Sequence, residues 1–345
     1  MGYKVTIGIP AYNAGKYIER TLYSVLSQTF DSTQVLIVDD SSTDNTCDII
    51  YKFKRLHPKG CDIHLLKQKV NMGVSAARNR IIKEAEGEYL YFMDSDDTIE
   101  PETISLLYSK VTEVKADVAF ASYRKIVYDE TNREIIENHC YPDLVFYDNV
   151  SFCTYAFRKI GRFQSSPWNY LIQVSLLRNN NIHFINVNYW EDAVFMMEMV
   201  THMKKVVLCH NITYNYICRP NSLSNYQSRN SIPKSEIERN AFVVESMKKI
   251  AYNNIKKEYG SDINYFAIMF AFYTICGILG RRNLIVPSVS LYEMKKIIKT
   301  EISYQNIMNM NRRHCFHSFF WVLSKLPAFV SITVVWCLGR VKHII

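Results

Sequence analysis

The first 125 residues of the chain alternate between short apolar runs and segments with helical periodicity. The apolar runs are rich in β-branched and aromatic residues, as buried strands are. They occupy Val5–Ile9, Val35–Val38, Ile63–Leu66, Tyr89–Met93 and Val118–Ala121, and the helical segments between them include Ala14–Gln28, Thr43–Leu56 and Gly73–Ala85. This β-α-β-α rhythm predicts an α/β fold with a doubly wound, mainly parallel sheet covered by helices on both faces.

Polar clusters follow three of the predicted strands. Asn13 comes after the first, Asp39 and Asp40 after the second, and the acidic turn Asp94-Ser95-Asp96-Asp97 after the fourth. Ligands of such sheets bind outside the carboxyl ends of the strands. Three carboxylates within four residues repel one another unless a cation neutralises them, and oxygen ligands of this kind suit Mg²⁺ or Mn²⁺. The alternative is a solvated acidic turn that caps a helix beginning near Pro101.

The rest of the chain differs in pattern and in charge. Residues 126–225 are irregular and rich in aromatics, and from about residue 233 the pattern is helical. We therefore predict a first domain over 1–225, in two parts (1–125 and 126–225), and a helical region over 226–345. Residues 1–110 carry 13 Lys and Arg against 15 Asp and Glu, whereas residues 233–345 carry 16 against 7.

The basic C-terminal region favours anionic lipid or a phosphate-bearing substrate, and it contains no nucleic-acid-binding motif. Its stretch Ile263–Gly280 has no charge but is at the short limit for a membrane span, so a packed helix is favoured. We expect Phe319–Leu338 to form a helix in the membrane interface, with basic side chains on lipid headgroups. Alternatively, that helix packs against the domain formed by residues 1–225, and the sequence favours neither arrangement. The basic side chains are Arg312, Arg313, Arg340 and Lys342.

Nine cysteines are scattered from Cys47 to Cys337 without CxxC spacing, which indicates thiols in a reducing compartment. Met1 leads directly into the first predicted strand, so a secretory signal is not expected. Together these features predict a cytoplasmic protein, with peripheral contact to the cytoplasmic face of the membrane.

An ordered series of motifs runs through the chain. Its pieces are Ile9-Pro10-Ala11-Tyr12-Asn13, Val38-Asp39-Asp40-Ser41-Ser42-Thr43-Asp44, Asn71-Met72-Gly73, Ala77-Arg78-Asn79, Gly87-Glu88-Tyr89, Phe92-Met93-Asp94-Ser95-Asp96-Asp97, Trp168-Asn169, Glu191-Asp192-Ala193-Val194-Phe195, Tyr214-Asn215-Tyr216 and Arg219-Pro220-Asn221-Ser222-Leu223-Ser224. This series resembles the family 2 glycosyltransferases, which have the GT-A fold. The resemblance is close over residues 3–110 and looser as far as residue 224.

By this resemblance the chain transfers a sugar from a nucleotide-diphosphate donor, with UDP expected, to a saccharide acceptor. Residues 1–225 would form the catalytic domain, with the donor side in 1–125 and the acceptor side in 126–225. Asp94 would contact the donor ribose and Asp96 would ligate Mn²⁺ or Mg²⁺. Asp40 would accept a hydrogen bond from the base, although either Asp39 or Asp40 could instead cap the next helix. The other expected donor-binding residues are Pro10, Ala11, Tyr12, Asn13, Asn71, Arg78, Ser95, Arg219 and Ser222.

Some of these residues could have simpler roles. Asn71 could be a turn residue, and Arg78 could brace the acidic turn or form a surface ion pair. Arg219 and Ser222 resemble a mobile loop that closes over the diphosphate, but they could be ordinary turn residues.

The resemblance also implies a single displacement that inverts the anomeric configuration. Asp192 would be the base that deprotonates the acceptor hydroxyl, and Glu191 would support it or hold the acceptor. The alternative is that both simply stabilise a helix N-terminus. The family often has Lys after Trp-Asn, but Tyr170 stands there in this chain, which leaves the role of that Lys in doubt.

The sequence lacks the motifs that mark several other classes of nucleotide-binding enzyme. A dinucleotide-dependent enzyme would need a Gly-rich turn after the first strand, and a P-loop enzyme would need GxxxxGK[ST]; neither motif is present. A sugar nucleotidyltransferase or a non-catalytic saccharide-binding relative stays open as an alternative. The chain lacks the QxxRW motif of processive synthases, which favours addition of one sugar per encounter. The sequence does not specify the sugar, the acceptor, the linkage or the oligomeric state.

Overall fold

The computed structural model describes residues 2–128, 133–160, 165–187, 189–218 and 230–344. The chain divides into two compact units, each described here by itself. The first comprises Met1–Asn149, Ser165–Asn186 and His202–Tyr226, and the second Val150–Gln164, Val187–Thr201 and Gln227–Ile345. The predicted functional border at residue 225 remains a prediction. The boundaries of the two units differ from that border. Helix α7 (Glu191–Val200) belongs to the second unit because it packs against α8 (Lys234–Asn253).

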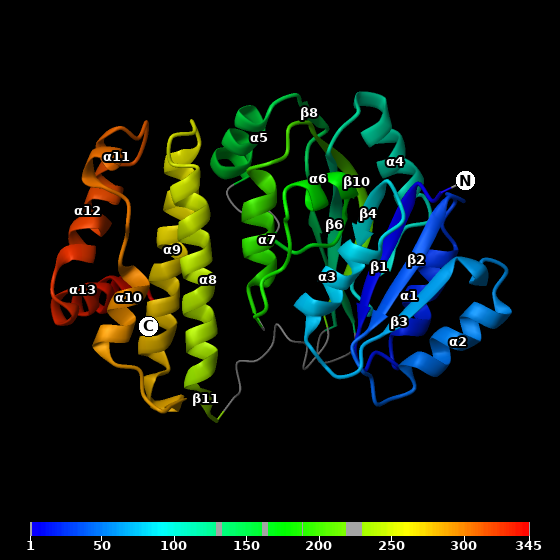
Figure 1. Cartoon of the computed structure of the whole chain (residues 1–345), viewed down its shortest axis with the longest axis horizontal. Helices are drawn as coiled ribbons and strands as arrows, with labels where there is room; N and C mark the ends of the chain where they lie inside the picture. Colours follow the sequence, from blue (N-terminus) through cyan, green and yellow to red (C-terminus); the bar gives the residue numbers. More distant parts are fainter. Residues whose placement is uncertain (1, 129–132, 161–164, 188, 219–229, 345) are drawn as a thin grey trace. The chain divides into compact units, whose positions relative to one another are not determined.

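The first unit is built on a mixed sheet, which has ten strands within the described residues, and Figure 1 shows its N-terminal strands side by side. Their order is β3-β2-β1-β4-β9-β6-β10-β5, with β7 paired to β6 and β8 to β10. The strands are β1 (Val5–Ala11), β2 (Thr33–Asp39), β3 (Ile63–Lys67), β4 (Tyr89–Phe92), β5 (Thr98–Ile99), β6 (Val118–Tyr128), β7 (Glu134–His139), β8 (Leu144–Phe146), β9 (Tyr170–Gln173) and β10 (Val206–Cys218).

The predicted doubly wound sheet is confirmed over β3, β2, β1 and β4, which are mutually parallel. The sequence did not reveal β9, which lies antiparallel between β4 and β6. It also did not reveal β10, which runs parallel to β6 with register shifts. Both strands come from the region that looked irregular, because β9 has only four residues and β10 interrupts its apolar pattern with His210 and Asn211.

Helices cover both faces of this sheet. Val5, Ile7 and Ile9 of β1 point into a core shared with α1 and α4. On the opposite face Gly8 lies under α3, so closely that a Cβ there would collide with Ile81. The helices of this unit are α1 (Ile18–Leu26), α2 (Thr46–Leu56), α3 (Val74–Glu84), α4 (Thr103–Val114) and α6 (Val174–Asn179), with a 3₁₀ turn at Gly60–Asp62.

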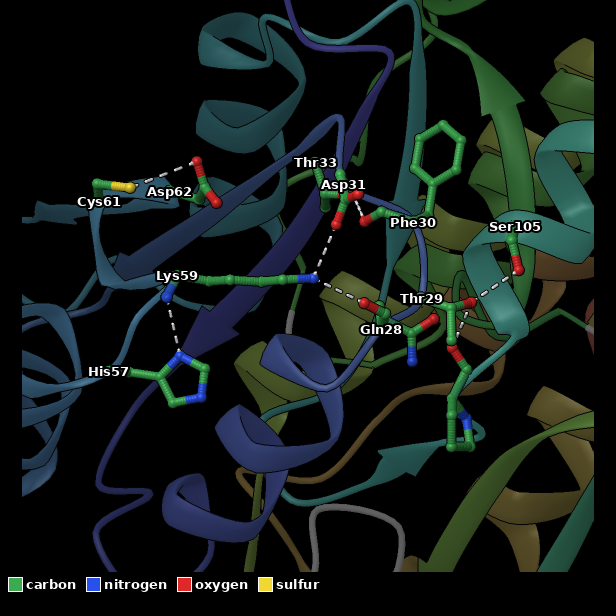
Figure 2. Close-up of polar contacts among 11 residues, drawn as sticks. Gln28, Thr29, Phe30, Asp31, Thr33, His57, Lys59, Cys61, Asp62 and Ser105 are labelled. Atoms are coloured by element: carbon green, nitrogen blue, oxygen red, sulfur yellow. Dashed lines mark hydrogen bonds and ion pairs between the residues drawn. The ribbon is translucent and has the colours of Figure 1, made fainter.

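The connection after α1 is fastened to its surroundings (Figure 2). The Lys59 ammonium donates to the Gln28 carbonyl at 2.8 Å and to the Asp31 carboxylate at 3.2 Å. Thr29 and Ser105 share a hydrogen bond between hydroxyls at 3.1 Å, which ties the same segment to α4. These contacts join the segment after α1 to Lys59 and to α4.

The second unit is helical, and its helices α8 and α9 lie side by side (Figure 1). Its apolar core joins side chains of α8, α9, α10, α12 and α13. The helices are α5 (Asn149–Tyr155, of which Asn149 belongs to the first unit), α7 (Glu191–Val200), α8 (Lys234–Asn253), α9 (Gly260–Gly280), α10 (Leu291–Ile298), α11 (Tyr304–Met308), α12 (His314–Lys325) and α13 (Ala328–Val341), with a π-helical turn at Ala156–Ile160, a 3₁₀ turn at Arg282–Leu284 and a short parallel pair β11 (Ile232–Pro233) and β12 (Ile285–Val286).

Among the described residues, α9 is the single helix long and apolar enough to cross a membrane. Of the residues in its most apolar window, 44% are buried inside the structure, and length and composition alone are weak grounds for a membrane span. The packed helix expected here stays a prediction.

The predicted single helix over Phe319–Leu338 is wrong. The chain breaks at Leu326 and Pro327, between α12 and α13. Leu326 is extended, with ψ 159°, because the ring of the following proline disfavours helical backbone at the residue before it.

Candidate active site

The acidic turn lies directly after β4, at the carboxyl end of the parallel strands. Ligand atoms of Asp94, Asp96 and Asp97 all lie within 4.8 Å of one another. Asp94, Ser95 and Asp96 are partly exposed, whereas Asp97 is buried. The predicted convergence of carboxylates at this edge is therefore present in the structure. Three carboxyl groups so close together match the oxygen donor set that Mg²⁺ and Mn²⁺ prefer.

Helix α1 fixes the backbone of this turn. The Thr21 hydroxyl is close to the carbonyl oxygens of Ser95, at 3.0 Å, and Asp97, at 2.8 Å. The Arg20 guanidinium donates to the carbonyl of Asp96 at 2.5 Å. With its carbonyl groups held by α1, the turn has one defined backbone conformation, and the positions of its carboxylates follow from it.

Tyr214 of β10 supports the turn from the buried side. Its hydroxyl donates to the Asp97 carboxylate at 2.6 Å and accepts from the Asp94 N–H at 3.2 Å. The amide of Ile217 donates to the other oxygen of Asp97 at 2.8 Å. The Tyr214 ring is held in turn by stacking on Trp168, with ring centroids 4.5 Å apart.

The electrostatic state of Asp97 follows from this environment. Burial is the largest cause that raises the pKa of Asp97 well above its usual range, followed by the negative charges of Asp94 and Asp96. The hydrogen bonds from the Ile217 amide and the Tyr214 hydroxyl oppose the shift. A cation bound among these groups would favour the ionised carboxylate, because opposite charge stabilises it.

Arg78 of α3 is a cation that pairs with a carboxylate of the turn. Its guanidinium lies 3.2 Å from the Asp94 carboxylate and 5.4 Å from the centroid of the Phe184 ring, and the residue is 6% exposed. The side chain of Asn79 holds Phe184 by two backbone hydrogen bonds, one donated at 2.7 Å and one accepted at 2.8 Å. Of the alternatives open for Arg78, bracing of the acidic turn is thus observed, and a surface ion pair does not fit its burial.

Asp40 lies at the end of β2 and is buried. Its carboxylate accepts from Gln68 at 2.6 Å and from the amides of Met72 and Gly73 at 2.7 Å each. A carboxylate offers about four lone-pair sites, so these bonds leave capacity for one more donor. The neighbouring Asp39 accepts from the Ser42 amide at 3.3 Å. Binding of the base by Asp40 stays a prediction, and the structure adds that Asp40 organises the loop around Asn71, which is exposed.

The residues predicted after β1 differ in exposure. Pro10 and Ala11 are buried within the strand, whereas Tyr12 is 50% exposed and Asn13 is exposed. Asn13 has a positive φ of 47°, and its side chain accepts from the Thr43 amide at 2.9 Å, which joins the loops after β1 and β2. These residues line the same sheet edge as Asp40, because Ala11 pairs with Asp39 across the two strands.

The predicted base lies in the second unit. Glu191 and Asp192 form the first turn of α7; Glu191 is buried and Asp192 is half-buried. Asp192 accepts a hydrogen bond from the Ala193 amide at 2.7 Å, a contact typical of a residue at a helix N-terminus. The preceding Trp190 has a positive φ of 68° and contacts Phe270 edge to face. The catalytic role of the pair stays a prediction.

Three further residues were singled out by sequence. Arg219 and Ser222 lie outside the described residues. Tyr170, which replaces the usual Lys of the family, is fully buried against Phe120.

Sequence reasoning missed the supporting residues Arg20, Thr21 and Tyr214 as parts of the site. Tyr214 belonged to a motif already noted, but its contact with the turn spans more than a hundred residues. Arg20 and Thr21 looked like ordinary helix positions, and no local pattern marks them.

Comparisons with known proteins agree with this geometry. The profile described as glycosyl transferase family 2 matches residues 6–179, half of the chain. A cholesterol galactosyltransferase of Borreliella burgdorferi is 26% identical over 281 residues, which cover 79% of this chain and 76% of that protein.

Two solved structures show the same fold. One is Staphylococcus aureus TarS 1–349 in complex with UDP-GlcNAc, with a TM-score of 0.67 and 20% identity over 96% of this chain and 89% of that chain. The other is the mannosyltransferase PcManGT of Pyrobaculum calidifontis with GDP-Man and Mn²⁺, with a TM-score of 0.52 and 14% identity over 97% and 87%.

Proposed function

Because the chain belongs to glycosyl transferase family 2, we propose that it transfers one sugar, with inversion, from a nucleotide-diphosphate donor to a saccharide acceptor. The observation that carries this proposal is the acidic turn, where Asp94, Asp96 and Asp97 converge within 4.8 Å at the carboxyl end of β4. The turn is held by α1 and Tyr214, so its carboxylates keep their positions before any ligand arrives.

The donor set fits a divalent cation. Asp96, with Asp94 and Asp97 beside it, would hold Mn²⁺ or Mg²⁺. When bound, such an ion supplies a Lewis acid that neutralises the charge developing on a departing diphosphate. The Mn²⁺ in the complex of the Pyrobaculum mannosyltransferase supports this assignment by analogy of fold.

On the donor side, the residues of the sheet edge would bind and orient the nucleotide. Asp40 would accept from the base with its remaining lone-pair capacity, beside the wall formed around Tyr12. Asp94, braced by Arg78, would accept from a ribose hydroxyl. UDP is the proposed nucleotide, and the sugar is a hexose or an N-acetylhexosamine; the UDP-GlcNAc bound by TarS and the galactosyl transfer in the name of the Borreliella protein support this class.

On the acceptor side, Asp192 would take the proton of the acceptor hydroxyl as its oxygen bonds to the anomeric carbon. The bond to the donor diphosphate breaks in the same displacement, and the electron pair leaves with the phosphate oxygen. Attack from the opposite face inverts the anomeric configuration. Glu191 would support Asp192 or bind the acceptor, and its burial favours support.

The acceptor proposed is a growing cell-surface polysaccharide or a lipid-linked saccharide, as the names of curated relatives suggest. We place the reaction in the cytoplasm. None of the nine cysteines forms a disulfide bond, which agrees with a reducing compartment.

The test begins with binding of UDP-GlcNAc, UDP-galactose and GDP-mannose, measured by thermal shift with Mn²⁺ and with EDTA. We expect one UDP-sugar to raise the melting temperature with Mn²⁺ and to lose most of the effect in EDTA. The anomeric configuration of the product is then read by NMR. Turnover at full rate in EDTA would contradict the metal assignment, and a product of retained configuration would contradict the single displacement.

A further inference from the structure

Helix α13 (Ala328–Val341) has two different faces. One face is buried in the core of the second unit, through Ser331, Ile332, Val335 and Gly339. The other face is exposed, and its residues recur at helical spacing. They are Phe329, Val330, Thr333, Trp336, Cys337, Arg340 and Val341.

The exposed face of α13 is apolar to an unusual degree. Phe329 is 69% exposed, Trp336 is 45% exposed and Val341 is 77% exposed. A single exposed apolar side chain is ordinary in a soluble protein. Several large ones on one helix face mark a surface that binds something.

The segment of chain that contains this face carries charge of one sign. Residues 302–345 contain five Lys and Arg and no Asp or Glu. Arg313 is turned inward, where it pairs with the buried carboxylate of Asp262. Lys325, Arg340 and Lys342 are exposed, and Arg340 lies 5.9 Å from the centroid of the Trp336 ring.

We propose that the exposed face of α13 docks on the surface of an anionic lipid bilayer. Apolar and aromatic side chains would enter the boundary between headgroups and acyl chains, and the cations would meet lipid phosphates. The helix lies in the interface and does not span it, because 14 residues extend about 21 Å against a hydrocarbon core of about 30 Å. This inference does not depend on the transfer reaction proposed above.

The charges argue against a second copy of the chain as the occupant. Association of two α13 faces would bring together the cations of both copies, with no acidic residue in 302–345 to pair with them. Juxtaposed like charges oppose association. An anionic bilayer supplies the opposite charge and the apolar layer together.

The experiment uses the full chain and two kinds of vesicle, phosphatidylcholine alone and phosphatidylcholine with phosphatidylglycerol. Flotation should recover the protein with the anionic vesicles and leave it behind with the neutral ones, and high salt should weaken recovery. Failure to float with anionic vesicles at low salt would overturn the proposal.

Variants locate the binding face. Arg340→Gln with Lys342→Gln should weaken vesicle binding about 30-fold, because each basic residue near an anionic surface contributes ~1 kcal/mol. Phe329→Ser should weaken it about tenfold through the lost apolar contact. Leu56→Ser, which alters a 64% exposed leucine of α2 in the first unit, should bind like the wild type.

Two controls distinguish bilayer docking from unfolding of a variant and from dimer formation. Each substituted side chain is exposed, so unfolding midpoints should stay near that of the wild type, and a variant that unfolds early is replaced by Val341→Ser. Quenching of tryptophan fluorescence by brominated lipid should fall in Trp336→Phe. If light scattering instead finds a dimer that Phe329→Ser converts to monomer, the face is an interface between copies and the proposal is wrong.

Discussion

Two buried aspartates, one in each unit, have opposite surroundings. Asp262, in the first turn of α9, is fully buried and is paired with two arginines, Arg158 at 2.8 Å and Arg313. Asp97, in the acidic turn, is equally buried but accepts from a tyrosine hydroxyl and a backbone amide. Its nearest charged groups include the carboxylates Asp94 and Asp96.

We propose that this difference separates a structural carboxylate from a ligand-binding one. A buried charge is tolerated when the protein supplies its counter-ion, as it does for Asp262. At the acidic turn the fold instead gathers three carboxylates; Arg78 offsets part of their charge at Asp94, and Arg20 donates to the carbonyl of Asp96. The proposed divalent cation would supply the remaining positive charge.

The largest expected effect tests the acidic turn itself. Asp96→Ala should abolish measurable turnover, a loss of more than about 10⁴-fold, because the proposed metal ligand is gone. The unfolding midpoint without metal should stay the same or rise, since one of three repelling carboxylates is removed. Turnover assays with Mn²⁺ and thermal unfolding in EDTA measure the two effects.

The control for that variant is Asp31→Ala, which removes an exposed carboxylate paired with Lys59 (Figure 2). It should keep wild-type turnover and cost at most about 1 kcal/mol of stability. An active Asp96→Ala protein would mean that the acidic turn is only a structural feature.

A third carboxylate extends the comparison, because Asp192 would act on a proton and not on a metal. Asp192→Asn keeps the size of the side chain and removes its basicity, so kcat should fall by about 10²–10⁴-fold. The dissociation constant of the donor should stay near normal, as measured by titration calorimetry. Glu191→Gln should have a smaller effect or act through acceptor affinity. Wild-type turnover in Asp192→Asn would leave stabilisation of the α7 N-terminus as the role of the pair.

The buried aspartate of the second unit, Asp262, should behave in the opposite way to Asp96, because its loss should affect stability and not turnover. Asp262→Asn leaves Arg158 and Arg313 without their shared carboxylate and should lower the free energy of unfolding by about 3–5 kcal/mol. Urea denaturation measures this loss, and the thermal shift on adding Mn²⁺ should persist. The neighbouring Glu258 is exposed, so Glu258→Gln should stay within about 0.5 kcal/mol of the wild type. A stable Asp262→Asn protein would show that the two arginines do not need it.

The smallest expected effect concerns Tyr214. Tyr214→Phe keeps the ring that stacks on Trp168 but removes the hydroxyl that links Asp97 to the Asp94 amide. The affinity for Mn²⁺ should fall about tenfold, as when other groups that orient metal ligands are removed. Tyr89→Phe is the matched control, because it removes a buried hydroxyl that donates to Ala116 instead. Equal Mn²⁺ affinities in the two variants would assign Tyr214 to folding alone.

Much of the fold of residues 1–125 was predictable from sequence, since it depends on local signals. Strands β1 to β4 and helices α1 to α3 follow from apolar periodicity, and parallel strands bring their carboxyl ends to one edge. That geometry alone predicts that Asn13, Asp40 and Asp94 gather there. The fold of residues 126–225 was less predictable because β9 and β10 form through pairings across long stretches of chain, with weak patterns of their own.

What the sequence determined by itself is the order of the elements, the position of the acidic turn at the end of β4 and the lack of acidic residues after Glu301. Only the tertiary structure decided that Asp97 is buried under Tyr214, that Arg78 braces Asp94, and that one face of α13 stays uncovered within its unit. The physical reason is that periodicity and turn chemistry act over a few residues. Burial and charge pairing depend instead on side chains brought together from 16 to 117 residues away along the chain.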